Sequence, residues 1–198
     1  MPTAPLRLAV FASGGGSNLG ALLDAIRAGT VDAAVTVVVT DRGGIGAIDR
    51  AIAAGIDVRT VAPSAYPSER ELADALLSVL RAARAEAVVL AGYLRRIPAA
   101  VVSAYDGRIV NVHPALLPAF GGAGMYGRHV HAAVLASGAR ESGCTVHLVD
   151  AEYDRGPILA QVRVPVMDGD TPETLAARVL AEEHRLLPAV VATLARER

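Results

Sequence analysis

The sequence contains no lysine, and all 19 of its basic residues are arginine. This absence excludes Schiff-base catalysis and the phosphate-binding loops that depend on a lysine side chain. Cysteine occurs once, at Cys144, so no internal disulfide can form, which is typical of proteins in a reducing compartment. Because Cys144 lies in an apolar, strand-like segment, we expect its thiol to be packed and inert.

The sequence also lacks an excess of charge of either sign and any long apolar run. Its formal net charge is −1, so electrostatics give no reason to expect nucleic acid as a partner. No uninterrupted apolar segment reaches membrane-spanning length, and the first residues show no signal-peptide pattern. We therefore expect a cytoplasmic protein without a membrane partner. Its 198 residues are predicted to form one domain, 1–198, with a full core.

Short apolar runs alternate with segments of helical periodicity along the chain. Strands are predicted at 6–12, 33–40, 58–61, 87–91, 108–112, around 146 and at 158–164. Helices are predicted at 19–28, 45–54, 68–83, just after 98, at 129–136 and from 172 onward. This alternation predicts an α/β fold with a mostly parallel, twisted sheet and helices on both faces.

The last predicted helix has a clear start. Thr171 offers an N-cap hydroxyl, Pro172 suits the first helical position, and Glu173 places an acid in the first turn. We expect this helix to reach about Leu187, with a kink at Pro188 before any continuation.

A glycine loop, Gly14 to Asn18, lies between the first predicted strand and the first predicted helix. In that position backbone N–H groups and the helix dipole converge on an anion, usually phosphate. A dinucleotide fingerprint would need glycine where Leu19 stands, and a Walker loop would need a Gly-Lys-Ser/Thr sequence. Two interpretations remain: a monophosphate site, or a tight turn that binds nothing.

The most informative stretch is Asn111-Val112-His113-Pro114-Ala115-Leu116-Leu117-Pro118, at the end of a predicted strand. Asn111 and His113 are two residues apart, so their side chains share one face, separated by roughly 7 Å of backbone. An amide and an imidazole can hold an oxyanion and move a proton, and such a pair needs a carboxylate from elsewhere in the fold. Asp154, in the turn Asp154-Arg155-Gly156-Pro157, offers such a carboxylate, although an aspartate in this turn also suits a purely structural role.

Four segments in order, at residues 13–19, 89–95, 111–118 and 154–157, together resemble the phosphoribosylglycinamide formyltransferases, folate-dependent enzymes of purine synthesis. The resemblance extends from about residue 7 to residue 190. The Asn-x-His-Pro-x-Leu-Leu-Pro motif is specific for the formyltransferase superfamily. The Gly-Ser-Asn loop and the single-domain length favour this member over methionyl-tRNA formyltransferases and formyltetrahydrofolate deformylases. The resemblance implies a Rossmann-like formyltransferase fold.

The resemblance also implies ligands and site residues. The substrates would be glycinamide ribonucleotide and, as co-substrate, 10-formyltetrahydrofolate, with no metal, in a monomer or homodimer. The ribonucleotide would contact Gly16, Ser17, Asn18, Leu19, Gly20 and Glu183. The folate would contact Arg70, Leu94, Arg95, Arg96, Ile97, Asn111, Asp150, Ala151, Glu152, Tyr153 and Asp154. The catalytic trio would be Asn111, His113 and Asp154. The stretch 120–128 is longer and richer in glycine than the commonest family version, so no contacts are predicted there.

The chemistry of the trio fits formyl transfer. When a primary amine attacks the formyl carbon, Asn111 and a protonated His113 can donate hydrogen bonds to the formyl oxygen as it gains charge. Asp154 can raise the pKa of the histidine and help to relay protons, through water. Hydrolysis of the formyl donor and nucleotide binding without catalysis are the rival functions.

Four further polar residues have open roles. Thr145 and His147 share one face of a neighbouring strand, where they either order a water molecule for the proton relay or only support the structure. His129 and His131 are two apart on a predicted helix and face different directions, so they are not expected to bind a metal together.

Overall fold

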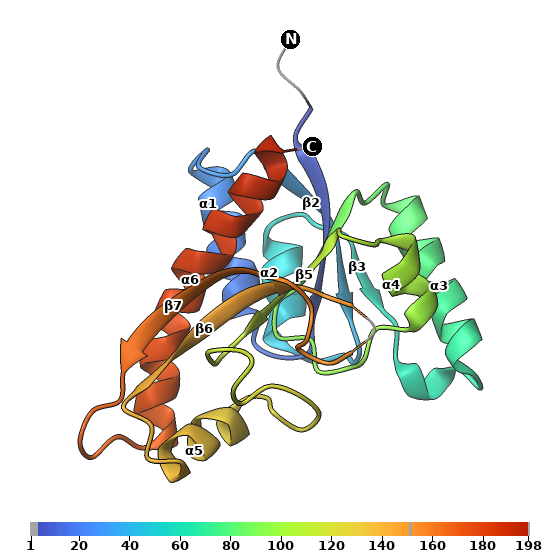
Figure 1. Ribbon diagram of the computed structural model, residues 1–198. Helices are drawn as coiled ribbons and strands as arrows, with labels where there is room; N and C mark the ends of the chain where they lie inside the picture. Colours follow the sequence, from blue (N-terminus) through green and yellow to red (C-terminus); the bar gives the residue numbers. More distant parts are fainter. Residues whose placement is uncertain (1–3, 151, 198) are drawn as a thin grey trace.

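The computed structural model describes residues 4–150 and 152–197, and within them the strands form one seven-stranded sheet of order β3-β2-β1-β4-β5-β6-β7 (Figure 1). Five neighbouring strands are parallel, whereas β6 runs antiparallel to β5 and β7 antiparallel to β6. The predicted mostly parallel sheet is thereby confirmed. The strands are β1 (Leu6–Ala12), β2 (Ala33–Thr40), β3 (Val58–Thr60), β4 (Ala87–Leu90), β5 (Ile109–His113), β6 (Glu141–Leu148) and β7 (Ile158–Pro165).

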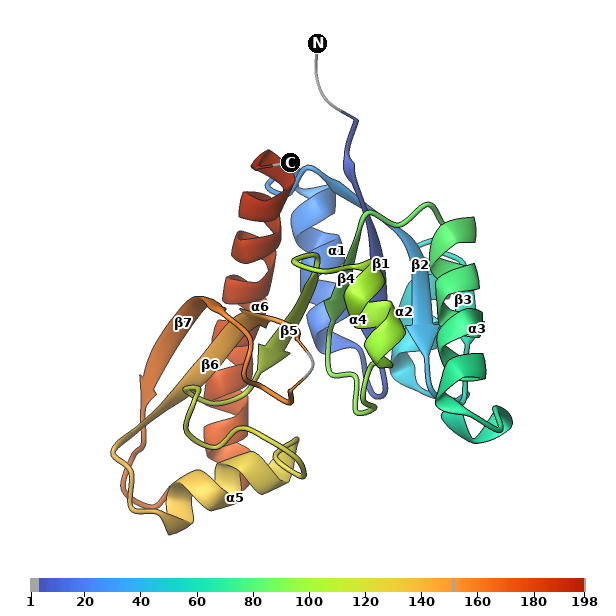
Figure 2. The same ribbon diagram turned by 45° about the vertical axis from the view of Figure 1, so that its right-hand side comes forward.

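Helices cover both faces of the sheet, as predicted (Figures 1 and 2). Helices α1, α2 and α6 pack on one face and α3 and α4 on the other, while α5 lies against α6 at the end of the sheet. The helices are α1 (Ser17–Arg27), α2 (Gly46–Ala53), α3 (Glu69–Ala82), α4 (Ala99–Ala104), α5 (Arg128–Ala136) and α6 (Pro172–Arg196). A short 3₁₀ turn at Pro63–Ala65 was not predicted.

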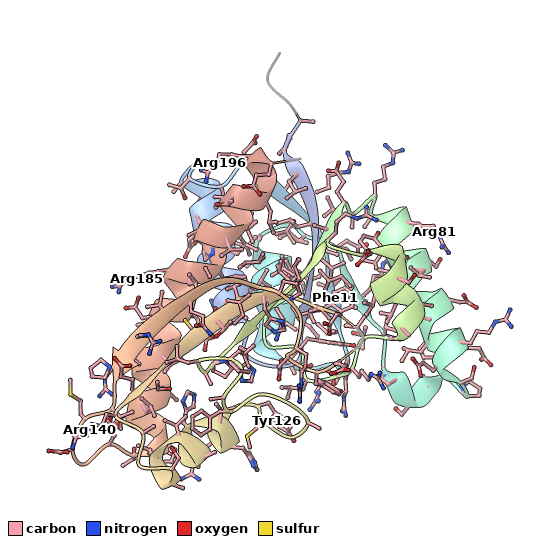
Figure 3. All side chains as sticks on the ribbon, viewed as in Figure 1. Phe11, Arg81, Tyr126, Arg140, Arg185 and Arg196 are labelled. Atoms are coloured by element: carbon pink, nitrogen blue, oxygen red, sulfur yellow. The ribbon has the colours of Figure 1, made fainter. Side chains whose placement is uncertain are left out.

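The central strand β1 explains why so few polar residues occur in the strand segments. Leu8 and Val10 pack under α1 and α6, whereas Ala9 and Phe11 pack under α3 and α4. Figure 3 shows Phe11 in the middle of the molecule, between the two layers of helices. A strand that is buried on both faces requires a near-continuous apolar sequence instead of strict alternation.

Helix α6 differs from the prediction at its C-terminal half. Thr171 and Thr174 form a reciprocal capping box at the start, and the helix then continues without a break through Pro188 to Arg196. Pro188 is buried between core residues such as Leu187 and Val191. Packing of this face against the sheet offsets the backbone hydrogen bond that proline removes. In the described part of the chain, no helix is both long and apolar enough to span a membrane.

The topology places a crevice at the edge where the parallel strands end. From β1 the chain moves outward to β2 and β3 on one side, and β4 and β5 lie on the other side. In open α/β sheets, ligands bind outside the carboxyl ends of the strands where the strand order reverses in this way. The glycine loop follows β1, and residues 91–98 follow β4, so both loops border this crevice.

The packing of α6 against the sheet gives a stability prediction. Leu187 is fully buried in the larger core cluster, so Leu187→Ala should lower the free energy of unfolding by roughly 2–5 kcal/mol. The control is Ile52→Ala on α2, where the side chain is 66% exposed and a change within about 0.5 kcal/mol is expected. Urea denaturation measures both values, and equal losses for the two variants would contradict the assigned core.

Candidate active site

A cleft of about 790 Å³ opens at this crevice. Its walls are the segments that follow β4 and β5, the loop and helix start at 122–128, the turn at 149–154, and the facing sides of α1 and α6. The predicted site residues that line it are Asn18, Leu94, Arg95, Arg96, Ile97, Asn111, His113, His147, Asp150, Glu152, Tyr153, Asp154 and Glu183. Side chains from most of the chain therefore meet at one place.

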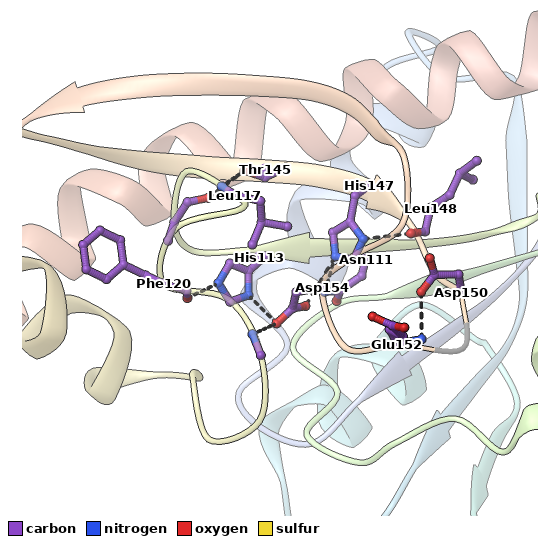
Figure 4. Close-up of polar contacts among 12 residues, drawn as sticks. Asn111, His113, Leu117, Phe120, Thr145, His147, Leu148, Asp150, Glu152 and Asp154 are labelled. Atoms are coloured by element: carbon purple, nitrogen blue, oxygen red, sulfur yellow. Dashed lines mark hydrogen bonds and ion pairs between the residues drawn. The ribbon is translucent and has the colours of Figure 1, made fainter.

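The predicted trio meets at the end of β5 (Figure 4). Asn111 and His113 both face the cleft from this strand, as their spacing predicted. The carboxylate of Asp154 lies with Oδ2 3.6 Å from His113 Nδ1 and Oδ1 3.5 Å from His147 Nε2. The backbone N–H of Gly122 donates a hydrogen bond of 2.9 Å to Asp154 Oδ2. One carboxylate thus links two histidines and the glycine-rich loop.

The orientation of the His113 ring is set by a backbone carbonyl. His113 Nε2 lies 2.8 Å from the carbonyl oxygen of Phe120, and because a carbonyl can only accept, Nε2 carries a proton. The other ring nitrogen, Nδ1, is then the one that faces Asp154. Among the residues that the structure describes, no backbone carbonyl holds this ring atom, so it is the position at which a proton can be exchanged with the site.

Backbone strain is stored on both sides of His113. Phe120 and Asp154 have φ angles of 56° and 54°, which side-chain-bearing residues rarely adopt. Between them, a Cβ atom at Gly121 would lie 2.6 Å from Leu117 Cδ2 and 3.1 Å from Asp154 Cβ, so a larger residue there would displace both side chains. Strained residues persist where the surrounding structure fixes them, and they concentrate at functional sites.

His147 orients Asn111. The register of β5 and β6 places Asn111 directly opposite His147. The Nδ1–H of His147 donates to the carbonyl of Leu148 at 2.8 Å, and Nε2 lies 3.1 Å from Asn111 Nδ2 and 3.5 Å from Asp154 Oδ1. An amide nitrogen has two hydrogens, so Asn111 keeps one of them for a ligand in the cleft.

Burial and charge oppose each other at the titratable groups. Burial lowers the pKa of His113, and the opposing effects of the Asp154 charge and the Phe120 carbonyl do not reverse this direction. Asp154 thus raises the His113 pKa, as expected, but burial outweighs this effect in the free protein. Burial alone would raise the pKa of Asp154, but contacts with His147, His113 and the Gly122 amide hold it below its usual value. Asp154 is thus ionised at neutral pH.

Thr145 faces the loop that follows β5 and lies outside the lining of the cleft that the described residues form. Its hydroxyl donates to the Ala115 carbonyl at 2.6 Å and accepts from the Leu117 amide at 3.1 Å and from Gln161 Nε2 at 2.8 Å. These partners occupy the hydroxyl fully. Of the two roles left open for Thr145, the structure favours support of the 114–118 loop over the ordering of a catalytic water.

Asn18 and Glu183 form the end of the cleft nearest to α1. Asn18 Nδ2 donates to Glu183 Oε2 at 2.6 Å, and both side chains are buried. Burial raises the pKa of Glu183, whereas the hydrogen bond from Asn18 lowers it, and the net direction is upward. The Oδ1 atom of Asn18 is buried without a protein partner, so it can accept a hydrogen bond from a ligand.

The start of α1 has the properties of an anion site. Its N-cap, Gly16, has φ 71° and offers no side-chain cap, and the first turn contains no acidic residue. The free N–H groups of this turn therefore favour negative charge. A Cβ atom at Gly16 would lie 2.7 Å from Ala47 Cα, so glycine is required for the close contact with α2.

Several predicted contacts lie elsewhere. Of the predicted residues that the structure describes, those absent from the lining of the cleft are Gly16, Ser17, Leu19, Gly20, Arg70 and Thr145. Leu19 is fully buried in the core, which suggests packing as its role, and Arg70 is exposed on α3. The predicted contact at Ala151 lies outside the described residues.

Residues of the glycine-rich loop and of α5 also line the cleft, although none of them was assigned from the sequence. Tyr126, 48% exposed, projects from this loop beside α5 (Figure 3). His131 is buried with its Nδ1 atom unpaired, and burial together with the nearby His113 lowers its pKa. His129 instead is exposed and lies against Tyr126. The two histidines face different directions, as predicted.

The chain matches the formyl transferase family over residues 6–191. Phosphoribosylglycinamide formyltransferase from Mycobacterium tuberculosis is 46% identical over 98% of this chain and 87% of that protein. The chloroplastic enzymes of the same name from Arabidopsis thaliana and Vigna unguiculata are 50% and 49% identical over 97% of this chain. The chain spans 66% and 62% of the length of these two plant relatives.

Solved structures match equally well. The crystal structure of glycinamide ribonucleotide transformylase 1 from Symbiobacterium toebii superposes with a TM-score of 0.93 at 42% identity, covering 98% of this chain and 90% of that one. With a family match over nearly all of its length, this chain belongs to the formyl transferase family.

Proposed function

We propose that this protein transfers the formyl group of 10-formyltetrahydrofolate to the amine of N1-(5-phosphoribosyl)glycinamide in purine biosynthesis. The observation that carries this proposal is the convergence of Asn111, His113 and Asp154 in one cleft between two different ligand surfaces. At one end lie Asn18, in the first turn of α1, and Glu183 on α6, and at the other end lie the segment 94–97 and the residues 150 and 152–154. The names of relatives at 46–50% identity support the same reaction.

The two ends of the cleft suit the two substrates. A phosphate would face the uncapped N–H groups at the start of α1, in a chain that offers no lysine for this purpose. The other end offers apolar surface among its charged residues, with Leu94 and Ile97 on one segment and the exposed ring of Tyr153 on the other. Such a surface suits the flat pterin ring of a folate.

In the proposed reaction a bond forms between the amine nitrogen and the formyl carbon, and the bond from that carbon to N10 of the folate breaks. The amine loses a proton, N10 gains one, and negative charge passes through the formyl oxygen. Asn111 donates its remaining amide hydrogen to this oxygen, an interaction of a type worth roughly 3–4 kcal/mol per donor. This scheme requires no covalent nucleophile and no metal.

His113 and Asp154 respond to the charge that grows in this step. Burial keeps the pKa of His113 low in the free protein, but negative charge on the neighbouring formyl oxygen favours the protonated ring. The ionised carboxylate of Asp154 acts in the same direction. The two groups therefore stabilise charge mainly in the transition state, where stabilisation raises kcat.

We further propose that residues 1–198 act as one catalytic domain, in the cytoplasm, as a monomer or homodimer.

Two rival functions are hydrolysis of the formyl donor and nucleotide binding without catalysis. One assay separates them: conversion of 10-formyltetrahydrofolate is followed with and without glycinamide ribonucleotide. Formyl transfer predicts turnover that depends on the amine, whereas equal turnover without it would establish hydrolysis and no turnover would establish the binding protein.

Asn18→Asp should weaken ribonucleotide binding. The parent Asn18 Nδ2 lies 2.6 Å from Glu183 Oε2, so the new carboxylate would repel this side chain. It would also compete with the substrate phosphate for the positive end of the helix dipole at the start of α1. We expect the Kd for glycinamide ribonucleotide to rise about 10- to 100-fold in titration calorimetry, or ~1.4–2.8 kcal/mol. The Kd for tetrahydrofolate should stay nearly constant.

The control adds the same charge elsewhere. Ser78 is exposed on α3, away from the cleft, so Ser78→Asp should leave both Kd values unchanged. Equal weakening of both ligands by Asn18→Asp would show that the glycine loop has only a structural role.

Asp154→Asn should reduce kcat about 10²- to 10³-fold, with little change in the Kd of either substrate. The amide keeps the shape of the side chain but removes the charge that favours a protonated His113. NMR titration of the His113 imidazole should accordingly show a lower pKa in the variant than in the parent protein.

Asp168→Asn, at an exposed position before α6, is the control for loss of one negative charge. A variant that keeps more than about a tenth of parental turnover, a loss of less than ~1.4 kcal/mol, would show that the carboxylate is not catalytic.

A further inference from the structure

A second buried carboxylate, Asp41, lies just outside the cleft and has no part in the chemistry above. It follows β2 at the carboxyl edge of the sheet, and its side chain is fully buried. An isolated buried carboxylate is strongly unfavourable unless it is paired and hydrogen-bonded. The partners of Asp41 therefore show what this charge organises.

The first partner is Arg95, from the segment 92–97 that lines the cleft after β4. Arg95 Nε donates to Asp41 Oδ2 at 2.8 Å. The neighbouring Arg42 donates to the same oxygen through Nη2 at 2.7 Å. Both guanidinium groups are about half exposed, whereas the carboxylate between them is not. Asp41 thus fixes the guanidinium group of Arg95 at the edge of the cleft through its Nε atom.

The second partner is Ser13, at the end of β1. The Ser13 side chain lies beside the Asp41 carboxylate and contributes to its lowered pKa, and the Ser13 hydroxyl oxygen accepts the Leu94 amide at 2.9 Å. The Ser13 amide in turn donates to the Gly92 carbonyl at 3.1 Å. Asp41 therefore reaches the backbone of the 92–97 segment as well as its Arg95 side chain.

The carboxylate stays charged under all working conditions. Burial alone would raise its pKa, but hydrogen bonds from Arg42, Arg95 and Ser13 lower it to about 2. Charge-assisted hydrogen bonds of this kind are stronger than neutral ones, so they can hold a segment that has no regular secondary structure. Residues 92–97 are such a segment.

We propose that Asp41 is a positioning residue for the folate half of the cleft. It fixes the 92–97 segment by holding Arg95 directly and the Leu94 amide through Ser13. The other half of the cleft is anchored independently, because the Gly14 carbonyl accepts from the Ala47 amide at 3.1 Å and Asn18 is bonded to Glu183. The inference rests on the proposed function, since it assigns the 92–97 surface to the folate.

The test is Asp41→Asn, which keeps the shape and removes the charge. We expect the KM for 10-formyltetrahydrofolate to rise about tenfold, or ~1.4 kcal/mol, with kcat and the KM for glycinamide ribonucleotide within about twofold of the parent values. A purely structural role would lower thermal stability without this division between the two substrates.

The matched control is Asp170→Asn. The Asp170 side chain is also buried and also paired with an arginine, Arg178, but it lies outside the lining of the cleft that the described residues form. It should lower the melting temperature without changing either KM. The proposal is overturned if Asp170→Asn raises the folate KM as much as Asp41→Asn does, or if Asp41→Asn raises both KM values equally or neither.

Two additions keep the result decisive. If Asp41→Asn does not fold, Ser13→Ala breaks only the path to the Leu94 amide and should raise the folate KM by itself; an unchanged KM then overturns the proposal. Calorimetric binding of tetrahydrofolate to parent and variant separates this inference from the proposed function. A parent without formyl transfer contradicts the function, whereas equal tetrahydrofolate Kd values in parent and Asp41→Asn contradict the role of Asp41.

Discussion

The carboxylate of Asp154 is the point on which the geometry of the site depends. It faces His113 on β5 and His147 on β6, and it accepts the amide of Gly122 from the glycine-rich loop. These three partners come from separate elements. Because Asp154 Oδ2 contacts both His113 and the Gly122 amide, the position of the imidazole and the position of the glycine-rich loop are linked. The side chain is 11% exposed, which keeps water from screening these contacts.

The site also shows how burial is balanced against charge. A histidine buried as deeply as His113 favours its neutral form, which opposes a role as hydrogen-bond donor through both nitrogens. The Phe120 carbonyl and Asp154 counteract this tendency, and each does so from a strained backbone conformation. The fold therefore accepts local strain, of the order of 1–3 kcal/mol per residue, to surround one imidazole with acceptors. The dense packing around Gly121 is what holds that strain in place.

Local features of the sequence were enough to predict the layers of the fold, because strands buried on both faces and amphipathic helices have distinct periodicities. The Asn111 and His113 pair was predictable for the same reason, since a spacing of two fixes a common face. Pro188 was harder to interpret: its effect on α6 depends on burial against the sheet and not on the chain around it. Glu183 entered only through family resemblance, because its partner Asn18 lies 165 residues away in sequence. Asp154 was visible as a carboxylate in a turn, but its place beside His113 came from the same resemblance. For Thr145, the partners that occupy the hydroxyl belong to other segments, so the strand pattern could not reveal them.

The two ends of the cleft are built differently, and this difference follows from topology. The Asn18 end lies between α1 and α6, whose regular backbone hydrogen bonds fix the backbone that carries Asn18 and Glu183. The opposite end consists of irregular segments after β4 and β6, whose backbone groups cannot pair within a regular element. Such segments need side chains as anchors, and buried carboxylates can each accept several donors at once. Asp41 holds the segment after β4 through Arg95, and Asp154, itself in the segment after β6, accepts the Gly122 amide from the loop after β5. In this sheet, the loops that follow the strands form the ligand cleft, and buried carboxylates at the ends of the strands hold those loops in position.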